Sequence, residues 1–349
     1  AYTGLVIAGG AFVAVILFPF MPRLAERYGA QQLALVFALV EMAVLFVLAA
    51  TPGVVASILL IASAMAVQPF LSYELDLLLE AASAEEGMSG RIRGAFLTAW
   101  NIAALTAPLI IGALLANSDA YGRVFLAAAA AMAPFIVLFT ARHLPRGTPP
   151  KFSHMRDTVM CIVRDRDLAA VTLAHLLLYL FLMWAPLYTP IYLHNVLGIP
   201  WSTLGWMFSI MLVPYVLLEY PAGWVADRFI GDKELMFVGF FIAGGGLAAI
   251  GFLSSTSSLA LILFVLVASR IGAALIESTT EGHFFRRVSE RDINSISVFR
   301  GIWPMANFIA PVAGSYILFF GDFQLFFVLT GGFIALAGAA TTLLTRDFR

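Results

Sequence analysis

The chain has 349 residues, of which 61% are hydrophobic and only 12% are charged, and its formal net charge is −1. Soluble domains carry about 25% charged residues, so this composition indicates a polytopic membrane protein. The near-neutral charge gives no reason to expect a nucleic-acid partner. The single cysteine, Cys161, excludes an internal disulfide framework.

Apolar runs long enough to cross a membrane recur along the whole chain, because a spanning helix needs about 20 apolar residues. Inside lipid the backbone must form its hydrogen bonds within the segment, so each run is predicted to be helical. The chain begins within the first run without a charged region or a cleavage-like site, so we expect no signal peptide there. The runs cover about residues 3–22, 31–50, 54–76, 95–116, 121–141, 168–193, 202–222, 235–254, 258–280, 296–319 and 323–344.

Basic residues predict the orientation, because they concentrate in cytoplasmic connections. Alternate connections carry almost all of them, whereas the opposite set contains essentially only Arg123. We therefore expect a multi-pass protein of a prokaryotic inner or plasma membrane, with a cytoplasmic C-terminus. The residues concerned are Arg23, Arg27, Arg91, Arg93, Arg228, Lys233, Arg286, Arg287, Arg291, Arg346 and Arg349.

One long polar connection divides the chain. Residues 142–167 are rich in basic residues and contain three prolines near their start. We interpret them as a cytoplasmic linker between a bundle formed by residues 1–141 and a second formed by residues 168–349. A short amphipathic helix around residues 153–164 and a solvated tether are both compatible with this composition.

The two predicted bundles share an internal repeat. A charged turn from Gly223 to Lys233 separates two apolar runs, and a related turn from Pro22 to Gly29 lies about 200 residues earlier. The segment Trp100–Pro108 also aligns with Trp303–Pro311, 203 positions later, and at the same offset Glu74 falls on Glu277 and Asp119 on Asp322. Such duplication is typical of secondary transporters, whose sites form where the repeats meet.

These residues resemble the major facilitator superfamily. The turn Gly223…Asp227-Arg228…Gly231…Lys233 is similar to the family's loop signature, with one extra residue between Arg228 and Gly231. The earlier copy carries Glu26, Arg27 and Gly29 at the corresponding positions. Ala103…Ala107-Pro108…Gly112 and Ala306…Ala310-Pro311…Gly314 are similar to the family's proline-glycine signature.

The resemblance implies an all-α fold of twelve helices in two bundles. About eleven helices are expected here, since the chain begins at what would be the second. The function implied is secondary transport of a small solute by alternating access, by a protein that needs no cofactor and that we expect to be monomeric. A sensor or scaffold of the same shape, which binds its ligand without moving it, is the alternative.

The charged turns are candidates for a cytoplasmic lock. Gly223 and Gly231 allow close approach of neighbouring helices, and the negative charge of Asp227 suits a helix N-terminus. Arg228 is expected to pair with Glu219, Glu277 or Glu281. In the first bundle, the equivalent pair would join Arg27 to Glu74 or Glu80. The alternative is that these charges only anchor helices at the lipid–water boundary.

Ionisable residues within predicted spans are candidates for substrate binding or coupling, because each costs about 2.5–3.5 kcal/mol near mid-bilayer. Arg270 needs a carboxylate or an anionic ligand, as substrate contact or as a structural pair. Glu41 is a candidate for proton coupling or for helix packing. His175 shares a helix face with Tyr179, and because histidine in general titrates in the physiological range it is a candidate for cavity lining or coupling, with an interhelical hydrogen bond as the alternative.

Other polar and aromatic residues give weaker indications. Asn101 and Asn307 are cavity candidates, with interhelical bonding as the alternative. Trp184, Tyr188 and Tyr192 form a stripe near the outer end of a span, which favours an interfacial aromatic belt over a substrate platform. The five histidines are scattered, and no phosphate-binding motif occurs, so we expect neither a metal site nor an enzyme.

Overall fold

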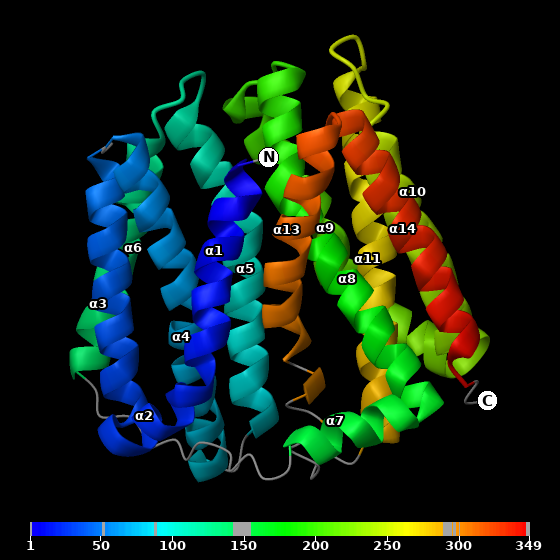
Figure 1. Ribbon diagram of the computed structural model, residues 1–349, viewed down its shortest axis with the longest axis horizontal. Coiled ribbons are helices and arrows are strands. Elements are labelled where there is room, and N and C mark those ends of the chain that lie inside the picture. Colours follow the sequence, from blue (N-terminus) through cyan, green and yellow to red (C-terminus); the bar gives the residue numbers. More distant parts are fainter. Residues whose placement is uncertain are drawn as a thin grey trace. The chain divides into compact units, whose positions relative to one another are not determined.

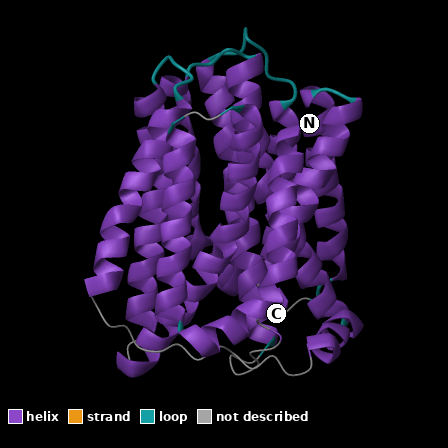
Figure 2. Ribbon diagram, turned by 60° about the vertical axis from the view of Figure 1, so that its left-hand side comes forward, coloured by secondary structure: helices purple, strands orange, loops and turns teal. Residues whose placement is uncertain are grey.

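A computed structural model of the protein describes residues 2–50, 53–86, 89–141, 155–288, 295, 298, 299 and 301–346. These residues form helices joined by short connections, and no strand occurs among them (Figure 2). The chain separates into two compact units, residues 2–151 and residues 152–349. We call them the N-terminal and the C-terminal unit.

The N-terminal unit is a set of long helices packed side by side (Figure 1). Helix α4 packs against α1, α3 and α5, and α3 packs against α6. Alanines at every fourth position of α3, residues 30, 34 and 38, are buried and let its neighbours approach closely. The elements are α1 (Tyr2–Leu17), η1 (Phe18–Phe20), α2 (Met21–Tyr28), α3 (Ala30–Ala49), α4 (Val54–Glu86), α5 (Ser89–Leu115) and α6 (Tyr121–Ala141).

The C-terminal unit contains the larger apolar core. Helix α10 packs against α11 and α14, while α8 packs against α11, α13 and α14. Its largest fully buried side chains include Tyr188, Phe181, Phe240 and Phe284. The elements are α7 (Met155–Arg164), α8 (Arg166–Ile191), the π-helical turn η2 (Tyr192–Val196), α9 (Trp201–Val225), the π-helical turn η3 (Ala226–Ile230), α10 (Asp232–Ile250), α11 (Leu259–Arg287), α13 (Ile302–Phe320) and α14 (Phe323–Leu344).

The described helices confirm the expected fold class and the expected number of spans. Ten are long and apolar enough to cross a membrane, or up to eleven if the bent pair Thr3–Leu17 and Met21–Tyr28 forms one span. The first predicted run, residues 3–22, is interrupted at Leu17, where η1 begins with Pro19 in its first positions. Proline cannot donate an N–H and disrupts a continuous helix, so the chain bends there.

The predicted linker contains a helix. Of residues 142–167, the structure describes 155–167, and Met155–Arg164 form α7, which packs against the start of α8. Ile162 is buried, whereas Val159 and Val163 are exposed. The helical interpretation of residues 153–164 therefore agrees with the structure over the part described. Residues 142–154 lie outside the described part of the chain.

Candidate functional site

The hydrogen bond that closes the turn between α9 and α10 spans one residue more than the one that closes the turn between α2 and α3 in the N-terminal unit. The Gly231 N–H donates to the carbonyl of Ala226, five residues earlier, with an N···O distance of 3.0 Å. The Gly29 N–H donates to Ala25, four residues earlier, at 2.9 Å. The extra residue before Gly231 is thus absorbed as a π-helical turn, the usual form of a one-residue insertion in a helix.

Both turns depend on a glycine at the same place. Gly231 has a φ of +99° and Gly29 a φ of +85°, a region that side chains with a Cβ rarely adopt. Each glycine ends one helical segment and directly precedes the next long helix. The backbone of the repeated turn is therefore the same in the two units except for the inserted residue.

The side chains of the second turn make local contacts. The Arg228 guanidinium is exposed and lies 5.8 Å from the ring centre of Trp224. The Lys233 ammonium donates to the carbonyls of Leu343 and Thr345 at 3.5 and 3.3 Å, which satisfies the end of α14. A Cβ on Gly223 would lie 3.3 Å from the Ser278 hydroxyl on α11, in accord with the expected close approach.

The predicted partners of Arg228 are only partly described. Glu277 is half-buried and Glu281 exposed on α11, whereas the side chains of Asp227 and Glu219 lie outside the described part of the chain. The pairing of Asp227 with a helix N-terminus and of Arg228 with an acid remains a prediction.

In the N-terminal unit, the structure does not bring Arg27 and Glu74 into an ion pair. Glu26 and Arg27 are exposed, and the Arg27 guanidinium lies 5.3 Å from the ring centre of Tyr28. Glu74 is fully buried in α4, and neither of its carboxylate oxygens has a hydrogen-bond partner among the described residues. The side chain of Glu80 lies outside the described part.

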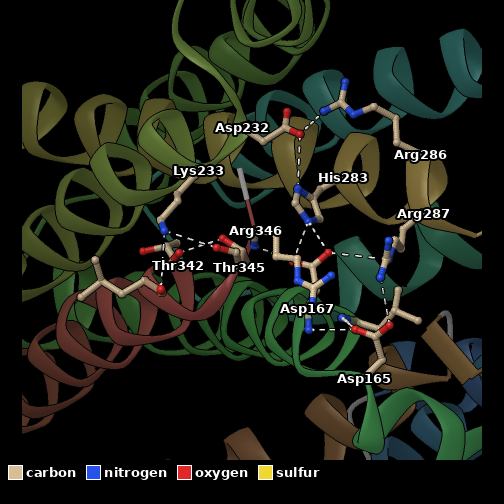
Figure 3. A network of polar contacts seen from close by, with 12 residues as sticks. Asp165, Asp167, Asp232, Lys233, His283, Arg286, Arg287, Thr342, Thr345 and Arg346 are labelled. Carbon is tan, nitrogen blue, oxygen red and sulfur yellow. Dashed lines mark hydrogen bonds and ion pairs between the residues drawn. The ribbon is translucent and has the colours of Figure 1, made fainter. Parts of the chain in front are cut away.

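A cluster of charged residues joins the ends of three helices, α8, α10 and α11, in the C-terminal unit (Figure 3). The His283 Nε2 atom lies 3.2 Å from both carboxylate oxygens of Asp167, and its Nδ1 lies 3.4 Å from Asp232. Arg286 pairs with Asp232. Arg287 lies 3.2 Å from Asp165 and 3.9 Å from Asp167. We call these six residues the aspartate–histidine cluster.

His283 lies between two carboxylates in this cluster. Both ring nitrogens of His283 face carboxylates, which can only accept hydrogen bonds when ionised, and only the imidazolium form has two N–H donors. His283 and Asp167 are almost fully buried, and Asp167 also accepts the Arg346 backbone N–H at 2.7 Å. The cluster thus brings three aspartates together with two arginines and a histidine.

The helix ends favour the same arrangement. Asp165 caps the N-terminus of α8 by accepting from the Asp167 and Leu168 N–H groups at 3.0 and 3.3 Å. Although burial opposes it, those N–H groups and the Arg287 guanidinium hold the pKa of the Asp165 carboxyl below its ordinary value. The aspartates lie at helix N-termini and Arg286 and Arg287 in the last turn of α11, where each charge suits the helix dipole.

The sequence did not reveal this cluster. His283 was one of five scattered histidines, and its partner Asp167 lies 116 residues away. A signal was nevertheless present, since Asp165, Asp167 and Asp232 precede apolar runs and Arg286 and Arg287 follow one. These positions predict capping at helix ends, although not which ends meet.

Arg270 lies in the middle of α11 and is 2% exposed. Its guanidinium lies 5.0 Å from the ring centre of Phe181 on α8 and interacts with Tyr215 on α9. Its Nη1 atom has no hydrogen-bond partner, and no carboxylate lies within 4.0 Å of it among the residues described. The expected structural ion pair is therefore not found in the described part of the chain.

His175 is packed within an aromatic group. Its ring stacks on Phe299 with the ring centres 4.0 Å apart, and Tyr179 contacts it edge-on at 4.7 Å. Its Nδ1 lies 3.3 Å from the Thr280 hydroxyl on α11. This contact is the interhelical hydrogen bond that was one of the two interpretations of His175.

Three further polar candidates are half-buried in their own units. Glu41 on α3 and Asn307 on α13 are half-buried, and each has a side-chain oxygen without a hydrogen-bond partner among the described residues. Asn101 is half-buried on α5. The described residues contain no group of three or more histidine, cysteine or carboxylate side chains placed to hold a metal ion.

The aromatic stripe does not form an interfacial belt. Trp184, Tyr188 and Tyr192 are buried, and all three donate to backbone carbonyls, namely those of Ala310 at 2.7 Å, Pro311 at 3.3 Å and Leu253 at 2.6 Å. A Cβ on Gly314 would lie 2.7 Å from the Tyr188 ring. The repeated proline-glycine segment is thus the surface of α13 against which α8 packs.

The helical spans define a multi-pass membrane protein with a repeated turn, and comparison with known proteins gives its family. Residues 171–348, more than half of the chain, match the family model of the Major Facilitator Superfamily. The chain belongs to this superfamily.

Two solved structures share the fold across nearly the whole chain. A point mutant of the nucleoside transporter NupG superposes with a TM-score of 0.76 and 16% sequence identity, covering 98% of this chain and 90% of that one. The NupG structure without the mutation superposes with a TM-score of 0.75 and 16% sequence identity, covering 98% of this chain and 89% of that one. No curated protein matches the sequence.

Proposed function

We propose that the chain is a secondary active transporter that moves a small solute by alternating access, with the C-terminal unit moving as one rigid body. The aspartate–histidine cluster is the observation that carries this proposal. It ties the ends of α8, α10 and α11 together by ion pairs and holds the end of α14 through the Arg346 N–H. Breaking buried ion pairs is costly, so these helices are expected to move together.

The repeated turns would act as the cytoplasmic lock. Basic residues are enriched on cytoplasmic connections, which would place Gly223, Asp227, Arg228, Gly231 and Lys233 on that side. Asp227, Arg228 and Glu277 would hold the outward-facing state and separate in the inward-facing one. Glu26, Arg27 and Gly29 would have the corresponding role in the N-terminal unit, whereas Glu74 is fully buried and makes no ion pair with Arg27.

The lock is tested by cysteine accessibility. In a Cys161→Ser background, single cysteines at Asn101 and Asn307 are labelled in membrane vesicles of known orientation with an impermeant maleimide. Asp227→Asn is expected to raise labelling from the cytoplasmic side. Asp157→Asn, an equal loss of charge on α7, is the matched control and should leave labelling at the parental level. An unaltered pattern in Asp227→Asn would refute the lock.

Proton coupling is a separate element of the proposal. Glu41 lies within a spanning helix with an oxygen that lacks a hydrogen-bond partner among the described residues, and His175 is buried beside Thr280. A carboxylate or imidazole at such depth is retained mainly for function. Uptake driven by an acid-outside gradient is expected to fall in Glu41→Gln and His175→Ala, while solute exchange without a gradient persists. If acid-driven uptake is unchanged in both variants, both assignments are wrong.

Solute exchange across proteoliposomes separates a transporter from the alternative, a ligand-binding sensor. A sensor is stabilised by its ligand but shows no counterflow. NupG is a nucleoside transporter, but at 16% identity the likeness to it supports the fold alone. The chemical class of the solute must therefore be argued from residues of this chain.

A further inference from the structure

Among the described residues of the C-terminal unit, one cation lies deep within a spanning helix. Arg270 follows the first residue of α11, Leu259, by 11 positions, which at 1.5 Å per residue is about 16 Å into a hydrocarbon core about 30 Å thick. The other arginines and lysines of the described helices α8 to α11 and the turns between them lie at or near helix ends: Arg166, Arg228, Lys233, Arg286 and Arg287.

The surroundings of Arg270 compensate only part of its charge. The ring of Phe181 offers a cation–π contact at 5.0 Å, worth about 0.5–2 kcal/mol. Tyr215 offers the oxygen of a neutral hydroxyl. A charged side chain at mid-bilayer costs at least about 2.5–3.5 kcal/mol, and no described carboxylate pairs with this one.

The guanidinium keeps a donor for a ligand. Its Nη1 atom is buried without a hydrogen-bond partner among the described residues, although an unmade hydrogen bond to a buried charged group is costly. The guanidinium fork matches the two oxygens of a carboxylate, and the nearby Tyr215 hydroxyl can donate to the same group. A doubly charged phosphate is less suitable, because the described site supplies one positive charge.

We propose that Arg270, assisted by Tyr215, binds the carboxylate of a small organic monoanion, which is the transported solute. This inference rests on the proposed transport function and adds the chemical class of the solute. The carboxylate neutralises the buried guanidinium, so the solute is held in the mid-membrane region with little net charge in the site.

The test uses the purified full-length protein and matched pairs of probes. Acetate, lactate and benzoate, with acetamide, lactamide and benzamide as their neutral counterparts, are titrated at constant ionic strength, and the thermal unfolding midpoint is recorded. At least one carboxylate is expected to raise the midpoint saturably, while its amide does not. Failure of all three carboxylates to do so would overturn the proposal.

Variants then assign the effect to the site. Arg270→Gln is expected to weaken carboxylate binding at least about tenfold, as for loss of a hydrogen bond to a charged group. Arg270→Lys should retain part of the affinity, and Tyr215→Phe should reduce it less than Arg270→Gln does. Arg164→Gln removes an exposed cation on α7 and is the matched control, with affinity at the parental level. Equal affinity in Arg270→Gln and the parent would contradict the site.

A purely structural role for Arg270 gives a different result. In that case Arg270→Gln lowers the unfolding midpoint without any probe, and no carboxylate stabilises the parent protein. Coupling between Arg270 and Glu219 in a double-mutant cycle would likewise overturn the ligand site, because it would give Arg270 a protein carboxylate. The proposal predicts that Arg270→Gln leaves the probe-free midpoint unchanged or raises it.

Transport is measured separately on the carboxylate that stabilises the protein. Counterflow of that carboxylate in proteoliposomes supports both the site and the proposed function. Stabilisation without counterflow supports the site and contradicts transport. If a neutral amide shows counterflow and no carboxylate stabilises the protein, the carboxylate site at Arg270 is contradicted while the proposed transport function is supported.

Discussion

His283 lies between Asp167 and Asp232, with its Nε2 atom 3.2 Å from the Asp167 carboxylate and its Nδ1 atom 3.4 Å from that of Asp232. The three residues come from three different helices and are buried. The histidine therefore supplies part of the compensation that solvent does not give these carboxylates, together with Arg286 at Asp232 and Arg287 at Asp167.

Replacing His283 should lower the stability of the folded protein. His283→Leu leaves Asp167 without its main charged partner, and breaking a buried pair in this way costs about 3–5 kcal/mol. The measurement is the thermal or denaturant unfolding of the purified protein. Asp167→Asn keeps an acceptor for the Arg346 N–H. A double-mutant cycle of His283→Leu and Asp167→Asn therefore isolates the interaction between these two side chains. The double variant should lose much less stability than the two single variants lose together. Additive losses would exclude a stabilising interaction between His283 and Asp167.

The π-helical turn before Gly231 should tolerate removal of one residue. Deleting Ile230 leaves Ala-Asp-Arg-Phe-Gly, which matches Ala-Glu-Arg-Tyr-Gly in the N-terminal unit, where the closing hydrogen bond spans four residues. The deletion protein is expected to fold and to keep an unfolding midpoint within a few degrees of the parent.

The control for this deletion is Val238, an exposed apolar residue in the middle of α10. Its removal rotates the rest of the helix by about 100° relative to its neighbours and should prevent folding. If deleting Ile230 is as damaging as deleting Val238, the π-helical turn is required for the register of α9 and α10.

The contact between Gly314 and Tyr188 predicts a rescue. A Cβ at Gly314 would meet the Tyr188 ring at 2.7 Å, and overpacking in a tight interface costs about 1–3 kcal/mol. Gly314→Ala should lower the unfolding midpoint. Adding Tyr188→Leu should restore part of the loss, because it removes the atoms in conflict. The double variant would be no better than Gly314→Ala if the loss came from helix propensity or another contact.

The contribution of Asp165 to the stability of the fold should depend on pH. Its pKa is lowered in the folded protein, so its contribution to stability is present above the unfolded value of about 3.9 and is lost as pH falls through the lower folded value. Asp165→Asn keeps a capping oxygen and removes the charge. The parent should therefore be more stable than this variant at pH 5–7, and the difference should shrink below about pH 4.

A second variant separates the cap from the charge. Asp165→Ala also loses the hydrogen bonds to the Asp167 and Leu168 N–H groups, which is worth about 1 kcal/mol. It should be less stable than Asp165→Asn at all pH values tested. Equal stability of the two variants would show that the cap contributes nothing measurable.

Much of the fold could be predicted from the sequence because the bilayer limits what each segment can do. An apolar run such as 323–344 has to be a helix, since lipid offers no partner for its backbone groups, and the structure has α14 at Phe323–Leu344. The repeated glycines at 29 and 231 predicted two equivalent turns, since the positive φ that both adopt suits glycine. The extra residue before Gly231 was visible in the sequence, but its π-helical form was not.

Side-chain partners across helices could not be predicted in this way. The sequence placed Trp184 and Tyr188 in an interfacial belt, whereas the structure buries them against carbonyls of α13. It gave no sign of the role of His283, and it offered Glu74 as a partner of the exposed Arg27. Each of these outcomes depends on the rotation of a helix about its axis, which apolar runs with little amphipathic pattern leave open.

The sequence alone determined that this is a membrane transporter with spanning helices, a duplicated turn and a buried arginine near mid-bilayer. Hydrophobic length and the positions of charge are properties of each segment by itself, so they can be read along the chain. Only the tertiary structure decided that His283 joins Asp167 to Asp232 and that Arg270 faces Phe181 and Tyr215 without a described carboxylate. Those relations form between helices distant in sequence, where packing sets which faces meet.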